Sequence, residues 1–132
     1  MTEGVLREVT LALPMVPEME LEASKTAAAV AESIRMNPDR IDEVRMAVVE
    51  ACINALEHSQ ASKVFMTLQV VGERNPEKLR IMVQDNGKGF DPKQAPGRPP
   101  RGHGLKIIRG LMDEVEIRSG PEGTTVVMSR MR

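Results

Sequence analysis

The sequence predicts an α+β domain, a two-layer α/β sandwich whose sheet is mixed but mostly antiparallel and carries helices on one face. Three observations lead to this prediction. The chain has 132 residues, which suffices for one hydrophobic core. Apolar side chains repeat with the period of a strand in some segments and of a helix in others. These segments run in the order strand, two helices, two strands, short helix, two strands, so residues 1–132 are expected to form a single domain.

The first half of the chain predicts one strand and two helices. Residues 3–13 alternate apolar and polar side chains until a proline ends the strand. Residues 17–36 are rich in Ala, Glu and Met, which favour helix, and acidic residues fill the first turn. The segment 37–39, Asn-Pro-Asp, supplies a cap, a proline at the first helical position and an early acid. A second helix is therefore expected from there to about His58.

The second half predicts two hairpins separated by a loop and a short helix. The paired strands are 63–71 with 77–85, and 115–118 with 124–128, and both connections are rich in turn residues. Residues 86–104 concentrate Gly and Pro and hold almost no apolar side chains, which is typical of a loop. Residues 105–112 restore a helical pattern.

Composition narrows the classes of partner and compartment. Eighteen basic residues against 19 acidic ones give a net charge of −1, so no global field favours nucleic acid or an anionic membrane. Two Phe, with no Trp or Tyr, provide no stacking platform for bases, and the ten Met are expected to fill the core. The chain has a single cysteine and shows neither a signal-peptide pattern nor a long apolar run. These features favour a cytoplasmic location.

The second predicted helix carries the first candidate site residues. Glu50 and Asn54 are four residues apart and therefore share one face. The expected core stripe consists of Ile41, Val44, Val48, Cys52 and Ala55. One interpretation makes Glu50, Asn54 and Glu57 a solvated face opposite that stripe. The other makes Asn54 a ligand of Mg²⁺, which needs only one or two protein oxygens beside phosphates and waters.

The segment D-N-G-K-G places Asp85 at the end of a predicted strand, before Gly87 and Gly89. A carboxylate that leaves a buried strand end accepts hydrogen bonds from a ligand amine, and glycines allow the ligand to approach the backbone closely. The alternative is an ordinary Asn-Gly turn.

A glycine-rich entry precedes the short helix: Arg101, Gly102, His103, Gly104 and Leu105. The backbone N–H groups and the positive dipole end of such a helix suit an anion, and Arg101 is either a phosphate partner or a solvated loop residue. The chain lacks a Walker phosphate loop and a dinucleotide glycine fingerprint. Two histidines and one cysteine do not have the spacing of a zinc site.

Taken in order, these motifs resemble the ATP-binding boxes of the GHKL superfamily. They are E-x-x-x-N on a helix, D-N-G-K-G-F after a strand, G-H-G-L opening a helix and G-T-T on the last strand. With A-L-E-H after the asparagine and G-L-K-I-I-R-G-L after the glycine box, the chain is most similar to bacterial anti-sigma factor serine/threonine kinases. The resemblance covers essentially the whole chain and implies the Bergerat ATP-binding fold, a layered α/β sandwich with ATP beneath a lid.

The resemblance implies a role for each motif residue. Glu50 is expected to be the general base, Asn54 the Mg²⁺ ligand and Asp85 the acceptor for the adenine amino group. The expected nucleotide contacts further include Gly87 and Gly89 at the adenine end, Gly102, His103, Gly104 and Leu105 at the phosphates, and Thr125 near adenine.

The implied function is an ATP- and Mg²⁺-dependent serine/threonine protein kinase that sequesters a sigma factor and phosphorylates the antagonist of that regulation. A homodimer is expected by the same resemblance, without direct contact to nucleic acid or membrane. No phosphoacceptor histidine or upstream helix pair is recognisable, which favours phosphorylation of a separate protein. Two alternatives remain: a non-catalytic ATP-gated binding module, and an interaction domain without ligand.

Overall fold

The computed structural model describes residues 4–58, 63–86, 104–121 and 123–132. Its elements are β1 (Gly4–Leu13), α1 (Met19–Ser33), α2 (Pro38–His58), β2 (Val64–Gly72), β3 (Lys78–Asp85), α3 (Gly104–Leu111), β4 (Glu114–Gly120) and β5 (Gly123–Met131). The predicted order of elements is confirmed. The last two strands are longer at both ends than the sequence pattern predicted.

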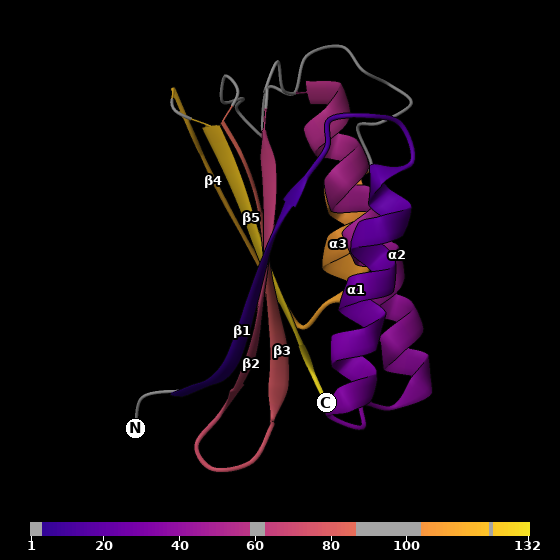
Figure 1. Cartoon of the computed structure of the whole chain (residues 1–132), viewed down its shortest axis with the longest axis vertical. Helices are drawn as coiled ribbons and strands as arrows, with labels where there is room; N and C mark the ends of the chain where they lie inside the picture. The colour runs from indigo at the N-terminus through magenta and orange to yellow at the C-terminus, as the bar shows by residue number, and fades with distance from the viewer. Residues whose placement is uncertain (1–3, 59–62, 87–103, 122) are drawn as a thin grey trace.

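The five strands form one sheet in the order β1-β2-β3-β5-β4. Every neighbouring pair is antiparallel, so the expectation of a mixed sheet is corrected for the described strands. The reason lies in the connections. β2 and β3 form a hairpin, as do β4 and β5, while α1 and α2 run in opposite directions and return the chain to the end at which β1 finished (Figure 1). β2 therefore runs back alongside β1.

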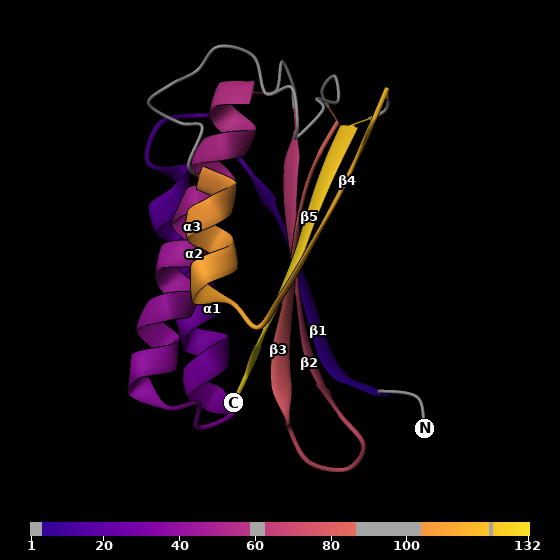
Figure 2. The same ribbon diagram turned by 180° about the vertical axis from the view of Figure 1, so that it is seen from behind.

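The three described helices pack on one face of this sheet, and no helix of the described ranges lies on the opposite face (Figures 1 and 2). Alternate residues of β3 point into the layer between sheet and helices, where Leu79, Ile81 and Val83 are buried. Five of the nine methionines in the described ranges are buried, as expected for a core with few aromatic residues: Met19, Met36, Met66, Met112 and Met128. Within the described ranges, no helix is both long and apolar enough to cross a membrane.

The end of the molecule at which α2 begins is held by what we call the Arg130 cluster, formed by Arg130, Glu43 and Asp113. Arg130 of β5 donates from Nη2 to Glu43 Oε1 on α2 at 2.8 Å and from Nη1 to Asp113 Oδ1 at 2.7 Å. The hydrogen bond to Glu43 raises the pKa of Arg130 above its ordinary value. Asp113 lies between α3 and β4, so the cluster fixes the helix layer against the sheet.

Candidate functional site

Some of the predicted site residues lie at the opposite end of the molecule. Asp85 is the last residue of β3, and the end of α2 and the turn between β4 and β5 lie at the same end (Figure 1). Asp85 alternates with Val83 and Ile81, so it faces the helix layer, and it is only 7% exposed. The expected buried carboxylate at a strand end is thus present.

Thr124 on β5 is the direct partner of Asp85. The two residues lie opposite each other in the sheet, and the Thr124 backbone N–H donates to Asp85 Oδ1 at 3.3 Å. Thr124 is 4% exposed and shares the helix-side face with Asp85. Thr125, the threonine predicted from the resemblance, lies opposite Gln84 and points to the helix-free face. Successive strand residues alternate faces, so the threonine beside Asp85 is Thr124.

Gly123 allows β5 to pass close to the end of β3. Its φ is +138°, in the region that favours glycine, and a Cβ atom there would lie 2.0 Å from the carbonyl oxygen of Asp85. Any side chain would therefore displace the backbone that carries the carboxylate. Gly123 and Thr124 were not among the predicted site residues, although both belong to the G-T-T motif that contributes to the resemblance.

A third strand joins this arrangement through Ser119 of β4. Ser119 lies opposite Thr124, and their hydroxyl oxygens are 2.8 Å apart, at hydrogen-bond distance. Side chains and backbone thus connect β4, β5 and β3 in the sequence Ser119, Thr124, Asp85. Spacing along the chain could not have shown this contact, because it depends on the register of the last hairpin.

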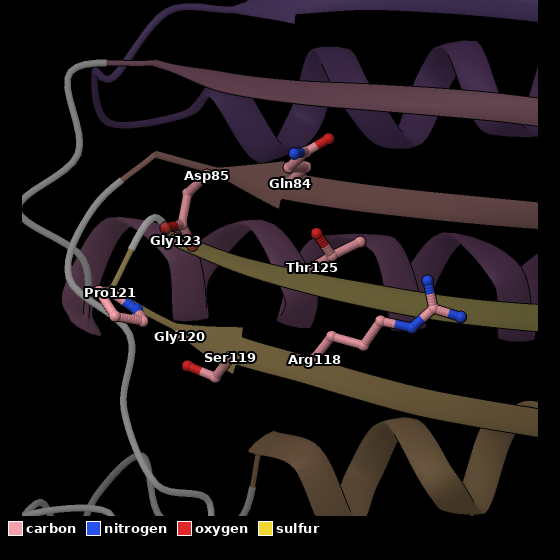
Figure 3. A pocket seen from close by; sticks show the side chains of 8 residues that line it. All are labelled: Gln84, Asp85, Arg118, Ser119, Gly120, Pro121, Gly123 and Thr125. Atoms are coloured by element: carbon pink, nitrogen blue, oxygen red, sulfur yellow. The ribbon is translucent and has the colours of Figure 1, made fainter.

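These strand ends surround a hollow of about 480 Å³. Its described lining comprises Gln84, Asp85, Arg118, Ser119, Gly120, Pro121, Gly123 and Thr125 (Figure 3). The side chain of Asp85 points toward Gly123 across the gap between their strands (Figure 3). Of the predicted residues, Asp85 and Thr125 line this hollow, whereas Glu50, Asn54 and Gly104 are not part of its described lining.

Asn54 on α2 was interpreted either as part of a solvated face or as a ligand of Mg²⁺, and its environment distinguishes the two. Asn54 is only 6% exposed, and its Oδ1 atom has no hydrogen-bond partner among the described residues. The solvated-face interpretation is therefore wrong for Asn54, while Glu50 is half-buried and Glu57 is exposed. The polar face of α2 does not face solvent throughout, because α3 packs beside α2 (Figure 2).

A buried acceptor without a partner costs on the order of 1–3 kcal/mol, so a native protein that keeps one calls for an explanation. An amide oxygen is a suitable ligand for a hard cation such as Mg²⁺. No group of three or more His, Cys, Asp or Glu side chains within the described part of the chain could hold a metal by itself. Asn54 therefore fits a metal that takes its other ligands from phosphates and water.

The remaining predicted residues belong to the glycine-rich segment. Gly104 is the first residue of α3, as expected, and Leu105 follows it half-buried. The predictions for Gly87, Gly89, Arg101, Gly102 and His103 concern residues outside the described ranges.

Residues 14–130 match the histidine kinase-like ATPase domain family. The chain belongs to this family. It is 30% identical to Serine-protein kinase RsbW of Bacillus cereus (strain Q1) over 136 residues, which cover 93% of this chain and 84% of that protein. The same identity and coverage hold for Serine-protein kinase RsbW of Bacillus thuringiensis subsp. konkukian (strain 97-27).

Among solved structures, the RsbU and RsbW domains of Rv1364c from Mycobacterium tuberculosis share the fold, with a TM-score of 0.73 and 19% identity. The match covers 95% of this chain but 32% of that longer one. Fold, family and relatives thus agree with the resemblance inferred from the motifs. This member of the ATPase domain family belongs with the RsbW serine-protein kinases.

Proposed function

We propose that this chain is an ATP-dependent serine/threonine kinase that phosphorylates a separate regulatory protein. Family and named relatives support the kinase activity. The structural observation that carries the proposal is the pair of buried polar groups at one end of the fold. One is the Asp85 carboxylate beside Thr124, and the other is the unpartnered amide oxygen of Asn54 on α2.

Asp85 is the proposed anchor of the adenine base. A buried, largely enclosed carboxylate selects a ligand group that donates a hydrogen bond, and the exocyclic amine of adenine is such a donor. Thr124 holds one carboxylate oxygen through its backbone N–H, which fixes the orientation of the acceptor. In this proposal Thr124 takes the place beside the base that the sequence had assigned to Thr125.

Asn54 is the proposed protein ligand of Mg²⁺. When bound, the metal would neutralise charge on the triphosphate during transfer. The buried amide oxygen supplies one ligand without adding a negative charge that would repel the phosphates. Gly104 at the start of α3 would present backbone N–H groups and the positive end of the helix dipole to the same phosphates.

Glu50 is the proposed general base. It lies one turn before Asn54 on α2 and is half-buried. The acceptor hydroxyl would lose its proton to the Glu50 carboxylate while its oxygen bonds to the γ-phosphorus and the bond to the β-phosphate oxygen breaks. The products are a phosphoserine or phosphothreonine and ADP.

The proposed partners are a sigma factor, which the chain sequesters, and an antagonist protein, which it phosphorylates. This places the chain in a cytoplasmic partner-switching pathway, as a homodimer. The supporting observations are the similarity to the RsbW kinases over most of the chain and the shared fold. Pull-down from native cytosol with Mg-ATP or Mg-ADP, followed by mapping of phosphorylated sites, tests the partners directly.

A kinase must be distinguished from a non-catalytic module that only binds its partners when ATP is bound. Glu50→Gln keeps the size of the side chain and removes the base. The kinase proposal predicts that this variant retains ATP binding and loses transfer of labelled phosphate to the captured partner. Unchanged partner regulation by Glu50→Gln would favour the binding module instead.

The base anchor is tested by Asp85→Asn. The substitution should weaken ATP binding by about 1.5–3 kcal/mol, the range for a hydrogen bond to a charged group, while the fold survives. Isothermal titration with Mg-ATP measures the change, and Asp42→Asn at an exposed position of α2 is the matched control. An ATP affinity equal to that of the unsubstituted protein would refute the assignment of Asp85.

A further inference from the structure

We propose that Ser119 is a positioning residue for the nucleotide base. Its hydroxyl holds the hydroxyl of Thr124, which in turn donates to a ring nitrogen that flanks the adenine amino group. This inference rests on the proposed function, because it takes Asp85 as the acceptor for that amino group.

The contacts place the three residues in one continuous row across the sheet. Ser119 Oγ lies 2.8 Å from Thr124 Oγ1, and the backbone N–H of Thr124 donates to Asp85 Oδ1 at 3.3 Å. Ser119 and Asp85 both line the hollow at the strand ends, whereas Thr124 is not part of its described lining (Figure 3). Thr124 lies opposite Asp85 on the neighbouring strand, so in this proposal a base that donates its amine to Asp85 brings the neighbouring atoms of its ring toward Thr124.

The chemistry of adenine fixes the direction of the hydrogen bonds in this row. The ring nitrogens on either side of the amine, N1 and N7, have lone pairs and no hydrogen, so Thr124 must donate to whichever one it meets. A hydroxyl has a single proton but can also accept. The hydrogen bond between the two hydroxyls must then run from Ser119 to Thr124, and either direction is compatible with the 2.8 Å separation. Ser119 thereby orients the proton of Thr124 toward the base.

A purely structural role for Ser119 is the competing explanation. Thr124 is 4% exposed, and a buried hydroxyl needs a partner whether or not a nucleotide binds. Such a role predicts a loss of stability on substitution but no dependence on individual atoms of the base. The two explanations therefore differ in how the substitution responds to nucleotide analogues.

The experiment measures dissociation constants of ATP, 1-deaza-ATP and 7-deaza-ATP for the unsubstituted chain and for Ser119→Ala. We expect Ser119→Ala to raise the Kd for ATP by about three- to tenfold, the effect of one hydrogen bond. The increase should disappear for the analogue that lacks the ring nitrogen bound by Thr124, and the two analogues distinguish N1 from N7. Ser119→Thr, which keeps the hydroxyl, should restore the affinity for ATP.

Two further variants test whether Ser119 acts through Thr124 and whether the effect is specific to this position. In a Thr124→Val background, Ser119→Ala should have no additional effect on the Kd, because the connecting hydroxyl is gone. Ser129→Ala is the matched control, since Ser129 of β5 donates to Glu114 of β4 at 2.9 Å in the same hairpin but away from the hollow. This control should leave the Kd unchanged.

Three results would overturn the inference: an unchanged Kd in Ser119→Ala, an equal increase for all three nucleotides, or an increase that persists in Thr124→Val. If Ser119→Ala does not fold, the unsubstituted chain still decides, because equal affinity for ATP and both analogues excludes a ring-nitrogen contact. Asp85→Asn separates this outcome from failure of the proposed function. Loss of ATP binding in Asp85→Asn with no effect of Ser119→Ala refutes only the role of Ser119.

Discussion

The polar side chains near the two ends of α2 differ in how they are paired among the described residues. Near the start of the helix, Glu43 is paired with Arg130, which also binds Asp113, although the buried Nε atom of Arg130 has no partner among the described residues. These ion pairs of the Arg130 cluster connect the helix layer to the sheet. Near the end of the helix, the Asn54 amide oxygen is buried without a partner among the described residues.

We therefore expect residues that stabilise the fold and residues that bind the nucleotide to lie at different ends of the molecule. Substitutions in the Arg130 cluster should change the free energy of unfolding without changing nucleotide affinity. Substitutions at the opposite end should reduce nucleotide affinity, and their effect on stability should depend on whether they disturb the backbone. Two predictions test this separation and a third concerns the middle of α2, given from the largest expected effect to the smallest.

Gly123→Ala should have the largest effect, because it disturbs the backbone and the site together. The new Cβ would lie 2.0 Å from the carbonyl oxygen of Asp85, and the residue would have to hold a φ of +138°. We expect a loss of about 2–4 kcal/mol in the free energy of unfolding, measured by urea denaturation, with loss of ATP binding.

Gly110→Ala in α3 is the matched control for Gly123→Ala. A Cβ atom at Gly110 meets nothing within 4 Å, so alanine should leave ATP binding intact and stabilise the helix by about 0.5–1 kcal/mol. Equal destabilisation by both substitutions would show that the close approach of β5 to Asp85 is not the cause.

Arg130→Met should lower stability by about 1–3 kcal/mol, because it leaves Glu43 and Asp113 without their shared partner. The two carboxylates are about one third exposed, so water compensates part of the loss. Mg-ATP affinity, measured by titration at a temperature where the variant is folded, should not change. Arg118→Met breaks an exposed pair with Glu116 and is the control, with no measurable effect on stability. A change in ATP affinity in Arg130→Met would show that the two ends are coupled.

Cys52, in the middle of α2, should have a smaller effect on the free energy of unfolding, and this effect should depend on pH. Burial, together with the charge of Glu20, raises the pKa of its thiol to about 12. Above pH 9 the unfolded chain releases the thiol proton while the folded chain keeps it, so stability should fall as pH rises. The expected loss is about 1–2 kcal/mol by pH 10, relative to Cys52→Ala. Parallel pH dependence in both proteins would contradict this assignment.

Much of the fold could be predicted from the sequence, because residue preferences and apolar periodicity indicated the same elements. The segment Asn-Pro-Asp at 37–39 marks the start of α2, and α2 begins at Pro38 as predicted. Strand β3 also ends at Asp85 as the alternation indicated. The antiparallel arrangement of all five strands could not be read from periodicity, because it depends on how the connections direct the chain in space.

The strand-end position of Asp85 could be predicted from the sequence, whereas contacts that depend on strand register could not. Asp85 was predicted by its position after a strand, whereas the choice between Thr124 and Thr125 depends on which face of β5 each occupies. The contact between Ser119 and Thr124 depends on the pairing of β4 with β5. The burial of Asn54 and the packing of α3 beside α2 are tertiary features that the helical pattern of either segment does not contain.

The most direct test of the account is the stability of Asn54→Leu with and without Mg-ATP. Leucine has a similar size and removes the buried oxygen that lacks a partner, so the nucleotide-free protein should be as stable as the original or more stable, by up to about 1 kcal/mol. Saturating Mg-ATP should stabilise the original chain, by about 2.7 kcal/mol at 100 times its Kd, but not the variant. A destabilised variant that still gains stability from Mg-ATP would contradict the claim that Asn54 is kept for a ligand.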